Sequence, residues 1–204
     1  MGRFLGSRAK LCRKYGENIF GSPKYDKILQ KKAYPPGEHG QGFRRRKSDY
    51  GIHLAEKQKV RFMYGLMEKQ FRGYFKKAAQ SKGVTGENLL KMLEMRLDNL
   101  IFRIGLGATR SQARQLVNHG HIRVNGRRVD IPSYICKTVD TIEVRPKSKA
   151  MKLFLDNLSF TRVESYPWLE LDKKNLKATV LNVPSRDQIP EKVDERLIIE
   201  YYSK

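Results

Sequence analysis

TRSQARQLVNHGHIRVNG, the sequence of residues 109–126, predicts a capped helix followed by a β-hairpin. Thr109 is a candidate N-cap, and Gln112 three residues later completes a capping box, so a helix is expected to begin here. Gly120 can adopt the left-handed conformation that commonly ends a helix. Asn125-Gly126 is typical of a type I′ turn between two strands. This short segment therefore predicts a helix, a stop, a strand and a hairpin turn.

The predicted helix has an apolar stripe and a polar face. Ala113, Leu116 and Val117 fall at positions i, i+3 and i+4, as in a helix that packs against a core. The positions around this stripe carry cationic, hydroxyl or amide side chains: Arg110, Ser111, Gln112, Arg114 and Gln115. The start of a helix also offers free backbone amides and a positive dipole end. This polar face is therefore expected to meet phosphate.

The composition indicates a polyanionic partner. The 204 residues include 42 Lys or Arg and 21 Asp or Glu, for a formal net charge of +21. The sequence pI is about 10.1. Such an excess is larger than a surface needs to stay in solution, and nucleic acid is the simplest explanation. Residues 1–50 hold thirteen Lys or Arg against four Asp or Glu, so the N-terminal part is the most basic.

Cysteine usage and hydropathy indicate a reduced, cytoplasmic setting. Cys12 and Cys136 lie far apart without C-x-x-C spacing, so neither a disulfide framework nor a zinc ribbon is predicted. The basic residues around Cys12 are expected to lower its pKa. No apolar run approaches the roughly 18 residues of a membrane span, so no membrane partner is expected.

The remaining patterns predict helices and short strands on either side of this segment. Residues 1–47, rich in Gly, Pro, Lys and Arg, predict an extended arm with short helical pieces. A first helix is expected from Ser48 or Asp49 to about Tyr64, and a second carries the apolar stripe Phe71, Tyr74, Phe75 and Ala78. A third is expected to begin at a cap at Thr85, and a fourth at Asp98 or Asn99. A strand is expected at 141–145, a helix at 150–158 with Met151, Phe154, Leu155 and Leu158 inward, a hairpin formed by 168–172 and 178–182, and a final helix from about Val193.

Further cations are candidates for RNA contact. The run from Arg44 to Lys47 follows two glycines, and phosphate contact is favoured over a solvated charge run or a nuclear-import signal. Arg96 and Arg103 are expected on the polar side of their helix. The complete set of predicted RNA-binding residues is Arg44, Arg45, Arg46, Lys47, Tyr50, Lys57, Arg61, Arg72, Arg96, Arg103, Arg110, Ser111, Gln112, Arg114, Gln115, His119, His121, Arg127 and Arg128.

The motifs of the common enzyme classes are absent, so catalysis is not expected. The sequence contains no P-loop, no G-x-G-x-x-G, no H-E-x-x-H and no G-x-S-x-G. His119 and His121 flank Gly120, where the end of a helix and the start of a strand are expected to splay their side chains, so RNA contact is favoured over metal binding. The aromatic motif of single-strand-binding sheets is also missing. Recognition of folded RNA by its shape is therefore predicted.

These residues carry a resemblance to a known family. Three stretches closely resemble the RNA-binding domain named after small-subunit ribosomal protein S4. They are RLDN from Arg96, RIG from Arg103 and SQARQLVNHGHIRVNGRRVDIPSY from Ser111. Five stretches outside that domain are similar to bacterial members of that ribosomal protein family. They are YPPGEHGQ from Tyr34, SDYGIHLAEKQKVRFMYG from Ser48, EKQFRGYF from Glu68, PWLELD from Pro167 and IIEYYSK at the end.

The resemblance implies a fold of the α+β class. It implies a basic extended N-terminal arm (1–47), a helical domain (48–93) completed by the C-terminal helix (about 190–204), and an inserted domain of helices packed on a small antiparallel sheet. The inserted domain would comprise the S4-type RNA-binding domain (94–158) and a hairpin extension (159–189).

The resemblance also implies a non-catalytic structural constituent of the small ribosomal subunit. Such a protein binds small-subunit ribosomal RNA early in assembly, at a junction of several helices in the 5′ domain. The implied neighbours are small-subunit ribosomal protein number five, other small-subunit proteins and messenger RNA near its entry site, with an influence on decoding accuracy. Arg44 to Lys47 match the family's basic stretch that faces the messenger path.

The chain departs from some family members in one respect. Those members bind zinc through four cysteines in the N-terminal segment, whereas this chain keeps only Cys12, has Ala9 where the preceding cysteine would stand, and has no cysteine between Gly16 and Tyr34. No metal or other cofactor is therefore expected, and the arm is expected to be held by ribosomal RNA.

Two other classes of protein are alternatives, and the first of them carries the same small domain as an appendage. One is an RNA-modifying enzyme or aminoacyl-tRNA synthetase, which would need a separate catalytic domain that the remaining residues do not supply. The other is a free regulatory RNA-binding protein such as a translational repressor. Co-sedimentation with small subunits through a high-salt wash distinguishes both from a ribosomal protein.

Overall fold

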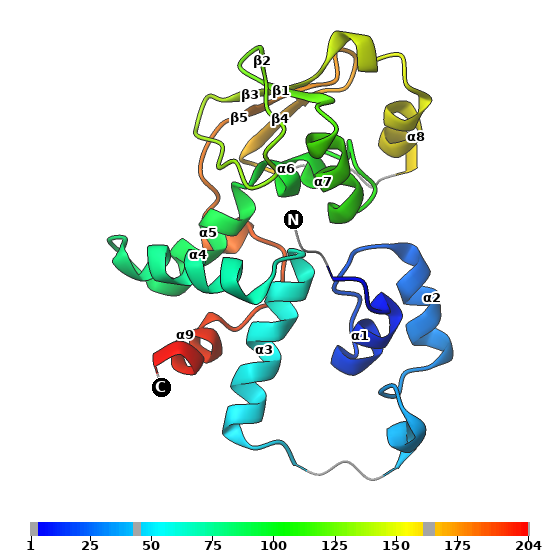
Figure 1. Cartoon of the computed structure of the whole chain (residues 1–204), viewed down its shortest axis with the longest axis vertical. Helices are drawn as coiled ribbons and strands as arrows, with labels where there is room; N and C mark the ends of the chain where they lie inside the picture. The colour runs from blue at the N-terminus through cyan, green and yellow to red at the C-terminus, as the bar shows by residue number, and fades with distance from the viewer. Residues whose placement is uncertain (1–3, 43–45, 161–165, 204) are drawn as a thin grey trace. The chain divides into compact units, whose positions relative to one another are not determined.

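The protein is described by a computed structural model that covers residues 4–42, 46–160 and 166–203 (Figure 1). The chain divides into two compact units, Met1–Lys76 with Lys192–Lys204, and Lys77–Glu191. We call the first the helical unit and the second the sheet unit. The combination of helices with a small antiparallel sheet confirms the predicted α+β class. The four segment boundaries at 47, 93, 158 and 189 stay predictions.

The helical unit contains helices from both ends of the chain. Its elements are α1 (Arg8–Tyr15), α2 (Pro23–Lys31), the 3-10 helix η1 (Glu38–Gln41), α3 (Asp49–Met63), most of α4 (Glu68–Gln80) and α9 (Glu195–Ser203). Ser48 caps α3, because its Oγ accepts a hydrogen bond from the Gly51 amide at 3.2 Å. The predicted arm thus contains two short helices, and the predicted start of α3 is confirmed.

Aromatic side chains join α9 to α3 and α4. Phe71 of α4 and Ile198 of α9 are fully buried. Tyr202 of α9 stacks on Phe75, with ring centroids 4.4 Å apart, and α9 lies beside α3 (Figure 1). The apolar stripe predicted for α4 therefore packs as expected and receives the last helix of the chain.

The sheet unit surrounds a five-stranded antiparallel sheet. Its helices are α5 (Thr85–Glu94), α6 (Leu97–Arg103), α7 (Arg110–Asn118) and α8 (Lys152–Phe160), with 3-10 helices η2 (Pro146–Ser148) and η3 (Arg186–Gln188). Its strands are β1 (Ile122–Val124), β2 (Arg127–Arg128), β3 (Thr141–Val144), β4 (Leu169–Asp172) and β5 (Lys177–Val180), in the order β2-β1-β3-β5-β4. Both predicted hairpins are present, although β2 has only two residues.

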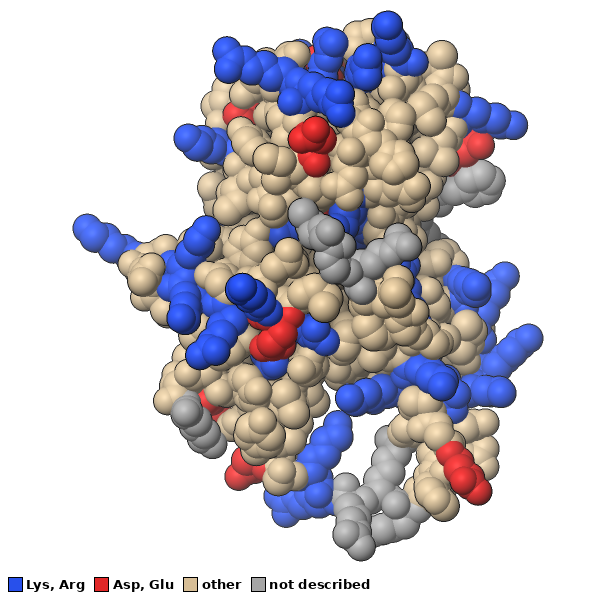
Figure 2. All heavy atoms as spheres, in the orientation of Figure 1, with Lys and Arg blue, Asp and Glu red and all other residues tan. Residues whose placement is uncertain are grey.

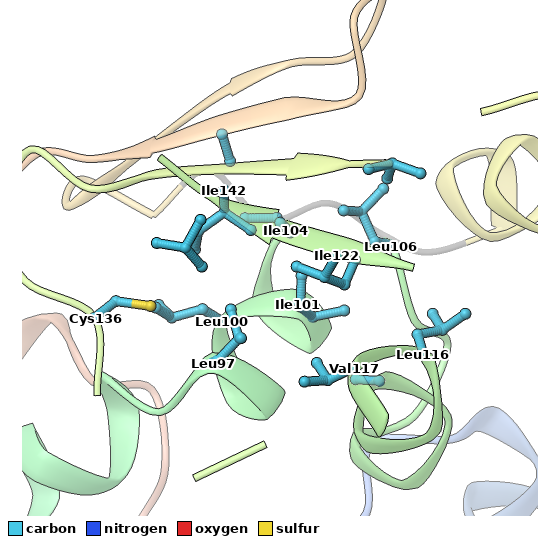
Figure 3. Close-up of a cluster of buried hydrophobic side chains, with 14 of the residues drawn as sticks. Leu97, Leu100, Ile101, Ile104, Leu106, Leu116, Val117, Ile122, Cys136 and Ile142 are labelled. Atoms are coloured by element: carbon cyan, nitrogen blue, oxygen red, sulfur yellow. The ribbon is translucent and has the colours of Figure 1, made fainter. Parts of the chain in front are cut away.

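One face of this sheet and two helices form the core of the sheet unit. Ile142 of β3 pairs with Val124 on one side and Ala178 on the other, and all three side chains are buried. In Figure 3, Leu100 and Ile101 of α6 point toward this face, and so does Val117 of α7. The alternation predicted for residues 141–145 is confirmed. The core fixes α7 by its apolar stripe and leaves its other face outward.

Three sequence expectations about helices are wrong in detail. The N-cap of α5 is Val84 and that of α6 is Arg96, instead of the predicted Thr85 and Asp98 or Asn99. Met151 and Leu155, predicted to point inward, are exposed, whereas Phe154 is fully buried. The helix α8 therefore packs by a narrower face than the pattern indicated. No helix among the described residues has the length and apolarity to cross a membrane.

Candidate RNA interface

The first turn of α7 is fixed by two capping hydrogen bonds. Thr109 Oγ1 accepts a hydrogen bond from the Gln112 amide at 3.2 Å, as predicted. The Gln112 side chain accepts its bond from the Ala108 amide at 2.6 Å, and not from Thr109 as in the standard capping box. Both bonds hold the loop before α7 close to the helix start. The first turn is therefore rigid where an anion would approach it.

The outer face of α7 is polar and accessible. Ser111, Gln115 and Asn118 are exposed at positions i, i+4 and i+7, and His119 continues this row at the end of the helix. These side chains come from the segment predicted to bind RNA. They offer hydroxyl, amide and imidazole groups that hydrogen-bond to phosphates and 2′-hydroxyls.

The turn between β1 and β2 is locked in place and presents two arginines. Asn125 and Gly126 both have positive φ, 51° and 77°, as the type I′ prediction requires. The Asn125 side chain donates to Asp140 Oδ1 at 2.8 Å and accepts from the Thr141 amide at 2.8 Å. The next residues, Arg127 and Arg128, are exposed. Figure 2 shows Lys and Arg side chains gathered at the end of the sheet unit that carries β2 in Figure 1.

The two histidines after α7 lie close together instead of splaying apart. The rings of His119 and His121 have centroids 6.1 Å apart, so the predicted separation is wrong. His121 Nδ1 lies 2.9 Å from Ser148 Oγ. Partial burial lowers the pKa of His121, and the nearby charges of His119 and Arg145 act in the same direction. Among the described residues, no group of three or more His, Cys, Asp or Glu side chains forms a metal site.

A second set of exposed cations lies in the helical unit. Arg72 on α4 is exposed together with Lys69 and Lys76, which occupy the same outer side of the helix. Arg46, Lys47 and Tyr50 are exposed at and before the start of α3. The predicted residues Arg44 and Arg45 lie outside the described residues.

Lys57 and Arg61 of α3 have partners within the helical unit. The Lys57 side chain is 2% exposed, its Nζ lies 2.8 and 2.9 Å from the two carboxylate oxygens of Glu68, and it stands 4.7 Å from the Tyr201 ring. Arg61 hydrogen-bonds Gln58 at 2.6 Å and covers the Phe62 ring at 4.2 Å. Lys57, a predicted RNA-binding residue, is therefore buried in an ion pair within the protein.

The pKa of Glu68 reflects this arrangement. Burial alone would raise the pKa of Glu68, but hydrogen bonds from Lys57 and Tyr202, together with the charges of Lys57 and Arg61, lower it overall. Glu68 is thus held ionised by the cation that it neutralises.

Arg96 and Arg103 are also buried, against the expectation that they lie on the polar side of α6. Arg96 binds Asp98 with two hydrogen bonds, at 3.0 and 2.5 Å. Arg103 binds the fully buried Glu94 at 2.9 and 2.7 Å and also contacts Glu191. Both arginines thus have the carboxylate partner that a buried cation needs.

Arg110 and Arg114, in the first two turns of α7, are half-buried. Arg110 Nη2 lies 2.5 Å from Glu191, its Nε donates to Asn99 at 2.8 Å, and its guanidinium covers the Phe102 ring at 4.6 Å. Arg114 lies 3.8 Å from Asp98. Sequence reasoning missed Glu191, because nothing in the sequence pattern indicates that a residue 81 positions away closes on the start of α7.

Neither cysteine is activated. Burial is the main cause that raises the pKa of the Cys12 thiol, so the expectation that surrounding cations lower it is wrong. Burial raises the pKa of Cys136 to about 12, with a smaller contribution from Asp140. Both thiols are therefore apolar core groups.

The comparisons with known proteins agree with this geometry. The model of the ribosomal protein S4/S9 N-terminal domain matches residues 3–94, and that of the S4 domain matches residues 95–142. The chain is 51% identical to small ribosomal subunit protein uS4 of Parabacteroides distasonis, 50% identical to that of Porphyromonas gingivalis and 48% identical to that of Pelodictyon phaeoclathratiforme, each alignment covering 100% of both chains. The chain therefore belongs to the ribosomal protein S4 family.

Proposed function

We propose that the chain is a structural, non-catalytic protein of the small ribosomal subunit that binds ribosomal RNA and nucleates assembly of its 5′ domain. The observation that carries this proposal is the sheet unit's outer surface. The exposed polar face of α7 and the locked β1–β2 turn with its two arginines are close in the chain, because only residues 119–121 and β1 separate them. Full-length similarity to small ribosomal subunit proteins supports the same assignment.

The proposed direct RNA contacts are the exposed members of the predicted set. They are Arg46, Lys47, Tyr50, Arg72, Ser111, Gln115, His119, Arg127 and Arg128, with Arg44 and Arg45 proposed from the sequence alone. Lys57, Arg96 and Arg103 instead neutralise buried or half-buried carboxylates. Arg61, Arg110, Gln112, Arg114 and His121 are half-buried and shape the surface from which the exposed groups project.

This surface suits recognition of RNA shape. Its groups are cations, amides and hydroxyls on a rigid helix and turn, which can follow a folded backbone and its 2′-hydroxyls. The aromatic residues of the sheet unit's core are buried or half-buried, as with Phe154 and Phe102, and form no base-stacking platform. A junction of several helices in the 5′ domain is therefore the proposed target.

The wider partnerships are proposed from the family resemblance. Contacts with small-subunit ribosomal protein number five and with messenger RNA near the entry site, and an influence on accuracy, belong to this group. Exposed Arg46 and Lys47 support the messenger contact, because they end the basic run that matches the family's messenger-facing stretch. Misreading rates in ribosomes carrying R46A/K47A test it, with unchanged accuracy counting against the messenger role.

A binding titration tests the central proposal. Full-length protein is titrated by filter binding against a 5′-domain fragment of small-subunit ribosomal RNA and against a duplex RNA of equal length. We expect at least hundredfold tighter binding to the folded fragment at the same salt concentration. Equal affinities would refute shape recognition. Loss of the protein from small subunits in a high-salt wash would refute the ribosomal assignment in favour of a free regulatory protein.

A further inference from the structure

Five side chains of the sheet unit form a closed ring of hydrogen bonds. Arg110 donates to Asn99 at 2.8 Å, and Asn99 donates to Glu94 at 2.9 Å. Arg103 donates to Glu94 at 2.7 Å and also to Glu191. Glu191 then accepts from Arg110 at 2.5 Å, which closes the ring. Two arginines and two glutamates balance in formal charge.

The ring joins elements that are far apart in the chain. Glu94 ends α5, Asn99 and Arg103 belong to α6, and Arg110 is the first residue of α7. Glu191 follows η3, and η3 packs beside α5 (Figure 1). Glu191 is thus the one member of the ring that the local sequence of α5 to α7 does not supply.

The ring is buried to an extent that makes its charges interdependent. The side chain of Glu94 is 0% exposed, and those of Arg103, Glu191 and Arg110 are 4%, 10% and 12% exposed. Without Glu191, the ring would hold two arginines and one carboxylate, that of Glu94, in a poorly hydrated site. A cation left unbalanced in such a site moves toward water, and its backbone moves with it.

We propose that Glu191 is a positioning residue for RNA binding, which acts by holding Arg110 and with it the first turn of α7. Arg110 directly precedes Ser111, and the exposed row of Ser111, Gln115 and Asn118 takes its direction from that turn. This inference goes beyond the proposed function but rests on it. It assigns Arg110 to the internal ring, so that the RNA meets the polar groups that the ring holds in place.

The sign of the effect separates this role from simple electrostatics. Removal of a negative charge from a protein of charge +21 strengthens RNA binding if charge alone acts. It also strengthens binding if Glu191 competes with phosphate for Arg110. A positioning role predicts weaker binding instead, because the polar face of α7 loses its fixed direction.

The test compares E191Q with E87Q in the full-length chain. Glu87 is a matched control, because it lies in the same unit, pairs only with Lys91 at 3.0 Å in the interactions described, and is 41% exposed. Both variants remove one negative charge. We expect E191Q to bind the 5′-domain RNA fragment at least tenfold more weakly than wild type, and E87Q to bind equally well or more tightly.

Three further measurements keep the test decisive if E191Q is unstable. E191D keeps the charge and should recover part of the affinity. The double variant R110A/E191Q should bind no more weakly than R110A alone, since Glu191 acts through Arg110. Trp168, the single tryptophan, is buried against Tyr166, whose ring lies 5.1 Å from the Arg103 guanidinium, so its fluorescence reports whether the sheet unit is folded during the titration.

The outcomes distinguish the inference from the function on which it rests. If folded E191Q binds as tightly as wild type or more tightly, the positioning role is wrong. If the double variant shows additive losses, Glu191 does not act through Arg110. If wild type itself does not prefer the folded fragment to the duplex, the proposed function fails.

Discussion

Arg128 of β2 lies across Gly120, the residue that ends α7. A β-carbon at Gly120 would stand only 2.4 Å from Arg128 Nε, and Gly120 has a φ of 70°. The Arg128 side chain therefore occupies the space that a side chain at Gly120 would need. Any side chain at Gly120 both strains the backbone and moves a proposed RNA contact.

G120A should lower the free energy of unfolding by about 1 kcal/mol, because alanine is disfavoured at positive φ. G126A is the matched control: Gly126 also has a positive φ, 77°, but nothing lies within 4 Å of its β-carbon position. Urea unfolding should give similar losses for both variants. Only G120A should also weaken RNA binding; equal affinities of the two variants would show that the position of Arg128 is unimportant.

R127A should reduce the salt dependence of RNA binding. Each lost phosphate contact removes about 0.7–0.9 from the slope of log affinity against log salt concentration. K173A is the control, since it removes one exposed cation from the turn between β4 and β5. Filter binding at several salt concentrations measures both slopes. A slope for R127A that equals that of wild type would place Arg127 outside the interface.

Replacing Glu68 should lower the free energy of unfolding more than replacing its partner Lys57 does. The side chain of Lys57 is 2% exposed and that of Glu68 is 46% exposed. E68A leaves a buried cation without its carboxylate and should cost about 3 kcal/mol. K57M leaves a carboxylate that water can reach and should cost only about 1 kcal/mol. Urea unfolding followed by circular dichroism compares them, and a larger loss for K57M would contradict this account.

Acidification should destabilise the sheet unit through His121. Its folded-state pKa is lowered from 6.5, so the unfolded chain takes up a proton at a higher pH than the folded chain does. The stabilisation is complete above pH 6.5 and is lost as the pH falls from there to the folded-state pKa. H121N should therefore flatten the stability profile between about pH 7.5 and 5.5.

The sequence predicts the elements of the sheet unit well because their signals are local. The Thr109 cap, the left-handed Gly120 and the Asn125-Gly126 turn each depend on residues within four positions, and all three are confirmed. The alternation at Ile142 and Val144 is equally local. Such signals act before any tertiary contact forms, so they are readable without the fold.

The fate of individual cations could not be predicted in the same way. Lys57, Arg96 and Arg103 occupy positions that a helical pattern marks as polar, and a polar position is as compatible with a buried ion pair as with solvent. For Arg103 and Arg110, the outcome depends on Glu191, whose approach to them follows from the complete fold. Burial of charge is a property of pairs. Lys57 and Arg96 pair with carboxylates 11 and 2 positions away, whereas Arg110 pairs with Glu191, 81 positions away.

The position of Glu191 late in the chain has a consequence for synthesis of the protein. Translation produces α5, α6 and α7 well before the carboxylate that completes their ring, and it produces α3 and α4 before α9. Both compact units thus wait for residues that are made after most of their other elements. The nascent chain carries incompletely neutralised arginines during that interval, and final compaction of each unit is coupled to the emergence of residues 191–203.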